Sequence, residues 1–238
     1  MQQPGLILTL ALGWMSTRAD SAALDSIGRT LTSWDCCKPA CAWSSSLRQN
    51  SNAHGYVKVC DKNDNPLSQS SGQSAQSSCS SSTGSGYLCS DYVPRPQSDN
   101  FSFGFAITDG VENCCKCYEL TWTDGPSKGR TMQVQIINEG GQGPNGTDGN
   151  GRDIIILTPG GGVGPNTRGC NSQFGDSWGD QYGGVTSRDA CATLPSNLQA
   201  GCYWRFNWAQ GDINNWPIRY HEIGCPDQLT SISGCTTS

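Results

Sequence analysis

Trp34–Cys41, WDCCKPAC, is the stretch from which the fold can be argued, because it places three cysteines beside one carboxylate within eight residues. Cys114–Cys117 repeats the adjacent pair followed by a third cysteine, and the 238-residue chain holds 14 cysteines, an even number. Such a set is typical of a disulfide framework. The alternative is a metal site, but adjacent cysteines lack the spacing of zinc ligands, and only His54 and His221 could add nitrogen ligands. We therefore expect disulfides and no bound metal.

The first residues indicate export. Gly5–Met15 is an apolar run of 11 residues, too short to span a bilayer, and the small residues Ser21-Ala22-Ala23 follow it, where a signal peptidase could cut. We expect residues 1–23 to be a signal peptide and residues 24–238 to form one domain of a secreted, extracellular protein. No later stretch is long enough to cross a membrane. Export leads to an oxidising compartment, in which the cysteines would pair.

The charge of the chain restricts its partners. The chain has 15 Lys and Arg against 20 Asp and Glu, which gives a formal net charge of −5. This charge would repel nucleic acid, anionic lipid and acidic polysaccharides, but not a neutral polymer. The glycine-rich stretch Gly160–Gly164 lacks the Lys-Ser/Thr ending of a phosphate-binding loop. We expect a monomer without a cofactor, acting on a neutral polymer.

Short alternating or β-branched apolar runs dominate the second half of the chain. They predict strands at Tyr118–Trp122, Met132–Ile137, Ile154–Leu157, Trp204–Trp208 and Ile218–Ile223. Only Ser187–Leu198 has a helical pattern, and that pattern is weak. Several short strands separated by long, glycine-rich loops favour a β-barrel.

The uncharged, serine-rich segment Ser68–Ser85 has the composition of a linker between domains. However, Cys79 lies inside it and Cys89 follows it, so disulfides would tie it to the rest of the fold. We expect a long surface loop of a single domain.

Carboxylates are the side chains that could support hydrolysis. The chain has no Gly-x-Ser-x-Gly motif, and a Ser-His-Asp triad would have to use His54 or His221, the latter in a strand pattern beside Arg219 and Glu222. A glycosidase instead needs two carboxyl groups, one protonated to release the leaving group and one ionised to activate water or attack carbon. Composition alone does not select two from 20 Asp and Glu.

WDCCKPAC at residues 34–41 resembles the N-terminal signature of the glycoside hydrolase family 45 endoglucanases. Further blocks that resemble this family follow in order, so the resemblance covers Ser33–Cys235. These blocks are Asn100–Ala106, Cys114–Thr121, Pro159–Gly164, Gln173–Gly175, Gln181–Gly184, Gly201–Phe206, Cys225-Pro226 and Cys235. Each block alone is a modest signal, whereas their order and spacing together are specific.

The resemblance implies a secreted, inverting endo-β-1,4-glucanase (a cellulase) that hydrolyses internal bonds of cellulose or a related β-glucan. It implies a mainly β fold, a six-stranded double-psi β-barrel with long disulfide-stapled loops and a few short helices. A groove would cross the barrel, with one catalytic aspartate on each side. The general base of the family falls on Asp35. Since inversion needs room for a water molecule, the two carboxyl groups would lie about 6.5–9.5 Å apart.

The general acid of the family is an aspartate shortly before the Pro-Gly-Gly-Gly-Val-Gly turn, which indicates Asp153. This residue stands six positions before Pro159, where the fungal pattern usually has four. An insertion of two residues keeps strand parity, so the side chain would still face the groove. Asp148 is the alternative acid.

Three positions depart from the family pattern. The motif usually has Thr-Arg-Tyr before Trp-Asp, whereas this chain has Leu31-Thr32-Ser33, so a tyrosine is absent at Ser33. Gly151 stands where a histidine is usual, and Gln142 where a third aspartate is usual. Asp148, from the longer glycine-rich loop, could substitute for that aspartate in binding substrate.

Aromatic side chains should line the groove, because sugars present apolar faces that stack on rings. By their positions in the motifs, Trp43 and Tyr182 are the candidates. Trp34 adjoins Asp35 and could belong to the core, where we also expect Trp204 and Trp208.

The family's disulfide pairing, carried onto the matching positions, implies seven bonds and no free thiol. Adjacent cysteines would bond to different, distant partners. The implied pairs are Cys36 with Cys170, Cys37 with Cys79, Cys41 with Cys114, Cys60 with Cys89, Cys115 with Cys235, Cys117 with Cys225, and Cys191 with Cys202.

Two alternatives without catalysis stay open. An expansin-like wall-loosening or carbohydrate-binding protein shares the double-psi barrel, but it is expected to lack the base, whereas Asp35 is present. A disulfide-rich defence or inhibitor protein would need no carboxylate pair. We also expect no separate carbohydrate-binding module after Cys235, and hence weak adsorption to crystalline cellulose.

Overall fold

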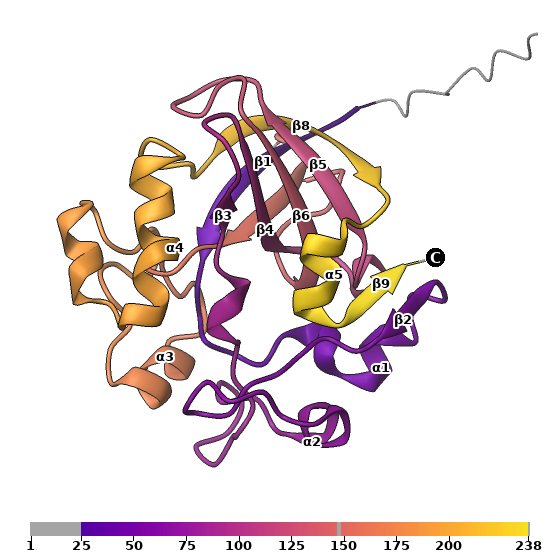
Figure 1. Cartoon of the computed structure of the whole chain (residues 1–238). Helices are drawn as coiled ribbons and strands as arrows, with labels where there is room; N and C mark the ends of the chain where they lie inside the picture. Colours follow the sequence, from indigo (N-terminus) through magenta and orange to yellow (C-terminus); the bar gives the residue numbers. More distant parts are fainter. Residues whose placement is uncertain (1–24, 147–148, 238) are drawn as a thin grey trace, which may run out of the picture.

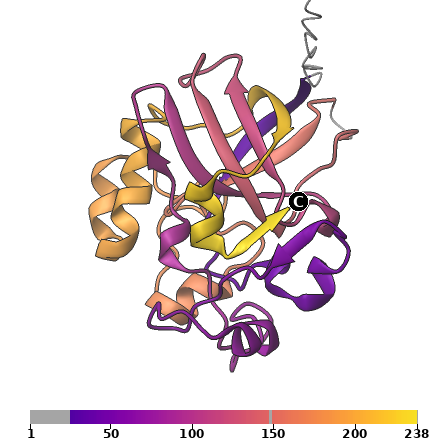
Figure 2. The same cartoon turned by 45° about the vertical axis from the view of Figure 1, so that its right-hand side comes forward.

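The computed structural model describes residues 25–146 and 149–237, so the predicted signal peptide at residues 1–23 lies outside the described residues. A barrel stands at the centre, surrounded by long loops and short helices (Figure 1, Figure 2). Its strands are β1 (Ser26–Ser33), β4 (Phe101–Thr108), β5 (Cys117–Trp122), β6 (Thr131–Glu139), β7 (Arg152–Leu157) and β8 (Trp216–Ile223), with β3 (Arg95–Pro96) added at β4.

The remaining elements are short. The α-helices are α1 (Ser44–Leu47), α2 (Gln69–Ser74), α3 (Arg168–Phe174), α4 (Ser196–Asn207) and α5 (Asp227–Ser233). The 3-10 helices are η1 (Ala40–Ala42), η2 (Ser90–Tyr92), η3 (Val111–Asn113) and η4 (Asp189–Thr193). Strands β2 (Ala53–Gly55) and β9 (Cys235–Thr237) form a separate small sheet.

The sheet closes on itself because β4 pairs with strands on both of its sides. The order is β4-β6-β5-β8-β1-β7, and β7 returns to β4 through the pairs Ala106↔Ile156 and Ile107↔Ile155. Two of these contacts, β1 with β7 and β4 with β6, are parallel, and the others are antiparallel. The predicted mainly β fold with a six-stranded double-psi barrel is confirmed.

Alternate residues of the strands fill the barrel. One buried apolar cluster contains every second residue of several strands, among them Leu120 of β5, Met132 and Val134 of β6, and Ile154 and Ile156 of β7. Side chains of a strand point alternately to the two faces of the sheet, so in a closed barrel one set meets inside. The other set packs outward against the loops and the disulfides.

The strand predicted at Trp204–Trp208 is wrong, because these residues lie in and just after helix α4. Residues four apart share a face of a helix, as residues two apart share a face of a strand, so this spacing fits both periods. The two rings stack with centroids 5.3 Å apart and pack against the barrel cluster. Their predicted place in the core is confirmed, since the exposed fractions are 2% and 5%.

The helical pattern of Ser187–Leu198 corresponds to two elements. Residues Asp189–Thr193 form η4, and α4 begins at Ser196. Pro195 separates them, since a proline lacks the N–H that a continuous helix would need at that position. The other four predicted strands are present as β5, β6, β7 and β8.

All seven disulfides implied by the family pairing are present, and no cysteine is free. The two cysteine clusters therefore hold no free thiolates that could bind a metal. Cys37 and Cys79 have Cα atoms 5.4 Å apart, so the serine-rich segment is bonded to the body as expected. Within residues 25–146 and 149–237, no helix is long and apolar enough to cross a membrane.

Replacement of Trp204 by alanine tests the place of α4 in the core. The buried indole also donates a hydrogen bond from Nε1 to Oγ of Ser102 (3.0 Å). We expect Trp204→Ala to lower the free energy of unfolding by about 3–5 kcal/mol, as for other buried aromatic residues. Denaturant titration with the disulfides intact measures this. Asn207→Ala, on the exposed side of the same helix, should cost less than about 1 kcal/mol; equal losses would contradict the assignment.

Candidate active site

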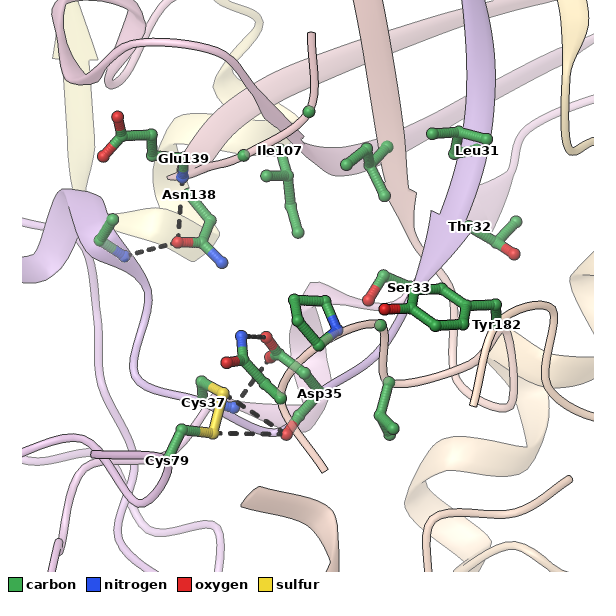
Figure 3. A pocket seen from close by; sticks show the side chains of 18 of the residues that line it. Leu31, Thr32, Ser33, Asp35, Cys37, Cys79, Ile107, Asn138, Glu139 and Tyr182 are labelled. Carbon is green, nitrogen blue, oxygen red and sulfur yellow. Dashed lines mark hydrogen bonds between the residues drawn. A yellow bond between two sulfur atoms is a disulfide. The ribbon is translucent and has the colours of Figure 1, made fainter. Parts of the chain in front are cut away.

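A groove of about 730 Å³ lies where the C-terminal ends of β1, β4 and β6 meet β7. Figure 3 shows its lining side chains, which come from segments far apart in the sequence. The lining includes Leu31, Ser33, Asp35, Lys38, Trp43, Ile107, Asn138, Glu139, Gly141, Ile155, Asn166, Tyr182 and Asp212.

Asp35 is buried but still lines the groove, with an exposed fraction of 5%. Its Oδ1 accepts a hydrogen bond from the backbone N–H of Cys37 (2.9 Å), and its Oδ2 accepts one from Nδ2 of Asn166 (2.9 Å). Burial raises the pKa of Asp35 above its usual value, and the two hydrogen bonds lower it in part. The net direction is upward, which makes the ionised carboxylate a stronger base than an exposed aspartate.

The backbone around Asp35 is held by its neighbours. Cys36 has a positive φ of 59°, which is rare outside glycine, and its disulfide to Cys170 ties this turn to helix α3. Gly169 allows the close approach, since a Cβ at this position would lie 2.2 Å from the carbonyl oxygen of Asp35. The turn directs the N–H of Cys37 back to the Asp35 carboxylate.

Asn166 is a site residue that the sequence reasoning missed. It lies two residues after the Pro-Gly-Gly-Gly-Val-Gly turn, in a loop whose composition gives no sign of a role. Only the folded chain brings this loop beside Asp35, 131 residues away in the sequence.

Asp153 does not lie where the family pattern led us to expect the acid. The side chain is absent from the groove lining and is 3% exposed. Its Oδ1 accepts from Nε of Arg29 at 2.7 Å, and its Oδ2 accepts from the backbone N–H of Gln142 at 2.8 Å. Oδ1 of Asp153 is thus engaged in a buried ion pair and Oδ2 in a backbone hydrogen bond, an arrangement that differs from the expected carboxyl group facing an open groove. The role of Asp153 as the acid stays a prediction.

Other carboxylates do line the groove. Among the described residues they are Glu139, at the end of β6, and Asp212, and the sequence reasoning singled out neither. Oδ1 of Asp212 accepts from the backbone N–H of Asn214 (2.9 Å) and lies 3.4 Å from Nη2 of Arg205. Asp148, the alternative acid, lies outside the described residues.

Both predicted aromatic residues line the groove. Tyr182 is 72% exposed, so its ring is accessible to a ligand. It lines the groove together with Ser33, the position at which the family tyrosine is absent (Figure 3). Trp34 is buried in the core, with an exposed fraction of 2%.

Lys38 packs against Trp43, the second predicted aromatic residue of the groove. Its Nζ lies 3.2 Å from the centroid of the Trp43 ring and donates hydrogen bonds to the carbonyl oxygens of Gln73 and Ala75, both at 2.9 Å. These carbonyls belong to the end of α2, in the serine-rich segment. The ammonium group thus connects that segment to the Trp43 ring through a cation–π contact.

Comparison with known proteins places this site in a family. A family model described as Glycosyl hydrolase family 45 matches residues 27–236. The chain belongs to glycosyl hydrolase family 45. The family and the barrel inferred from the motifs are thereby confirmed.

Relatives in family 45 are similar along most of the chain. A putative endoglucanase type K of Fusarium oxysporum is 42% identical over 224 residues, which cover 91% of this chain and 55% of that protein. The chain thus spans about half the length of that relative. An endoglucanase of Cryptopygus antarcticus is 36% identical, with 90% of this chain and 94% of that protein covered. The crystal structure of a cellulase from the same springtail matches with a TM-score of 0.78 at 35% identity, covering 91% of this chain and 99% of that one.

The titration of Lys38 can be measured directly. Burial lowers the pKa of Lys38 to about 8, because it removes water from around the charged ammonium group. In a ¹³C NMR titration, one lysine Cε resonance should titrate near pH 8, while exposed lysines titrate near about 10.4. Lys38→Arg assigns the resonance by removing it. A midpoint near pH 10 for Lys38 would contradict the buried contact with Trp43.

Proposed function

We propose that this chain is a secreted endo-β-1,4-glucanase, which hydrolyses internal bonds of cellulose or a related β-glucan with inversion at the anomeric carbon. The observation that carries the proposal is the buried Asp35 carboxylate on the lining of the groove, oriented by Cys37 and Asn166. Endoglucanase relatives that match most of this chain support it. Seven disulfides agree with export to an oxidising compartment, and a single domain that acts as a monomer stays part of the proposal.

In the proposed reaction Asp35 is the general base. It removes a proton from a water molecule while the water oxygen attacks the anomeric carbon from the face opposite the leaving group. The raised pKa of Asp35 increases its affinity for that proton. Trp43 and Tyr182 would stack on sugar rings of the glucan along the groove.

A second function is favoured by the surroundings of Asp153. The carboxylate expected to be the acid is engaged with Arg29, and the groove wall presents the apolar side chains of Ile107 and Ile155 instead. A groove that binds β-glucan but protonates no leaving group would act as a carbohydrate-binding or wall-loosening protein of the expansin type. The assignment of the acid to Asp153 stays a prediction, against which its ion pair counts.

Replacement of Asp35 distinguishes the proposed glucanase from a binding protein without catalytic activity. We expect the wild type to release reducing ends from soluble β-glucan and Asp35→Asn to reduce the rate at least about 100-fold, since the amide cannot accept the proton. The first product should carry the α anomeric configuration in proton NMR before mutarotation. Asp99→Asn, an exposed carboxylate away from the groove, is the control. Binding of glucan without release of reducing ends would favour the second function, and a β product would contradict inversion.

Asn166 should set the pH range of the base. Its hydrogen bond favours the ionised form of Asp35, so Asn166→Ala should raise the Asp35 pKa further. Activity requires ionised Asp35 and is lost as pH falls through its pKa. The acidic limb of kcat/KM should therefore move to higher pH by about 0.5–1 unit. Asn138→Ala, in the same groove but hydrogen-bonded to Ala40, is the matched control, and an equal shift there would contradict the role of Asn166.

A further inference from the structure

The pairing of β1 with β7 fixes which side chain stands near Asp35. The two strands run parallel without a bulge from Gly28↔Arg152 to Ser33↔Leu157. Asp153 lies beside Arg29, and Ile155 lies beside Leu31. This chain has two more residues between Asp153 and Pro159 than the fungal pattern. In the register with β1 these residues place Asp153 farther from the groove end of β7, and they do not bring it toward the groove.

Distances along the strand decide between the two positions. β1 ends at Ser33, which at about 3.3 Å per residue lies about 13 Å from the Arg29 row and about 7 Å from the Leu31 row, and Asp35 follows two residues later. An inverting pair of carboxyl groups is separated by about 6.5–9.5 Å. Along β1 the row of Ile155 lies about 7 Å nearer to Asp35 than the row of Asp153, so Ile155 is the better placed of the two to face Asp35.

The face of β7 agrees with this placement. Ile154 and Ile156 point into the barrel cluster, so Asp153 and Ile155 share the other face. Gly141 covers that face, and a Cβ there would lie 2.8 Å from Cβ of Asp153 and 3.3 Å from Cδ1 of Ile155. Only Ile155 reaches the groove lining, whereas Asp153 lies beneath Gly141 and its neighbour Gln142.

We propose that Ile155 occupies the position from which a general acid would protonate the leaving oxygen. Because an isoleucine has no proton to give, this chain cleaves bonds with activated leaving groups far faster than ordinary glucosidic bonds. The inference rests on the proposed role of Asp35 as base. In the step, the water oxygen bonds to the anomeric carbon, its proton passes to Asp35, and the bond to the leaving oxygen breaks. An aryloxide leaves as an anion without a proton, whereas a sugar alkoxide needs one, which in this groove comes from solvent.

The wild-type protein gives the first test. Rates would be measured on aryl β-cello-oligosaccharides whose leaving phenols span a range of pKa values, and on soluble β-glucan. Without a donor the rate should fall steeply as the phenol pKa rises, and β-glucan should be slowest. A flat dependence would overturn the inference, because it indicates protonation by the protein. No activity on any aryl substrate, or full activity of Asp35→Asn, would instead defeat the proposed function itself.

Variants at Ile155 give the second test. General acid catalysis contributes about 10²–10⁴-fold, so Ile155→Asp should increase β-glucan hydrolysis at least 10-fold and leave the most activated aryl substrate nearly unchanged. Ile155→Asn gives a side chain of the same shape as Ile155→Asp but without an acidic proton, and should give no gain. Asp153→Asn, Glu139→Gln, Asp212→Asn and Asp148→Asn, made in the wild type, test the other candidate carboxylates. A loss of β-glucan activity beyond 100-fold in one of them, with aryl activity kept, would identify that residue as the donor and overturn the inference.

Discussion

Three disulfides that begin within residues 36–41 constrain everything that surrounds Asp35. Cys36 is bonded to helix α3, Cys37 to the serine-rich segment, and Cys41 to Cys114 before β5. Adjacent cysteines with different partners fix the direction of the backbone between them, because neither can rotate without moving a distant segment. Asp35 directly precedes this junction, so a carboxylate that burial would otherwise penalise keeps one orientation and its hydrogen bonds.

The second constraint is the register of a closed barrel. In an open sheet a strand that gains two residues could slide or bulge, but β7 is paired on one side with β1 and on the other with β4. The pairs fix Ile155 beside Leu31, and parity then puts its side chain on the groove. Asp153 keeps the correct face but lies two residues too far along β7, where Arg29 and the backbone of Gln142 satisfy its charge.

The groove is also lined by residues that lie outside the family motifs. Lys38 is part of WDCCKPAC, yet its ammonium group binds the carbonyls of Gln73 and Ala75 and the ring of Trp43. The serine-rich segment thus contributes Ser77, Cys79 and Ser80 to the lining of the groove, and its backbone carbonyls hold the Lys38 ammonium group. This accounts for how a low-complexity stretch can belong to a functional surface once a disulfide fixes its position.

The sequence by itself determined four of the five predicted strands and, through the order of its motifs, the family, because alternation and motif order are read along the chain. The seven disulfide pairs and the place of Asp35 followed from the resemblance to that family. It could not decide between helix and strand for Trp204–Trp208, since a spacing of four satisfies both periods. It also could not show that Asn166 meets Asp35, that Asp153 pairs with Arg29, or that Ile155 takes the groove position. Those facts depend on contacts between segments far apart in sequence, and only barrel closure and the disulfides bring these segments together.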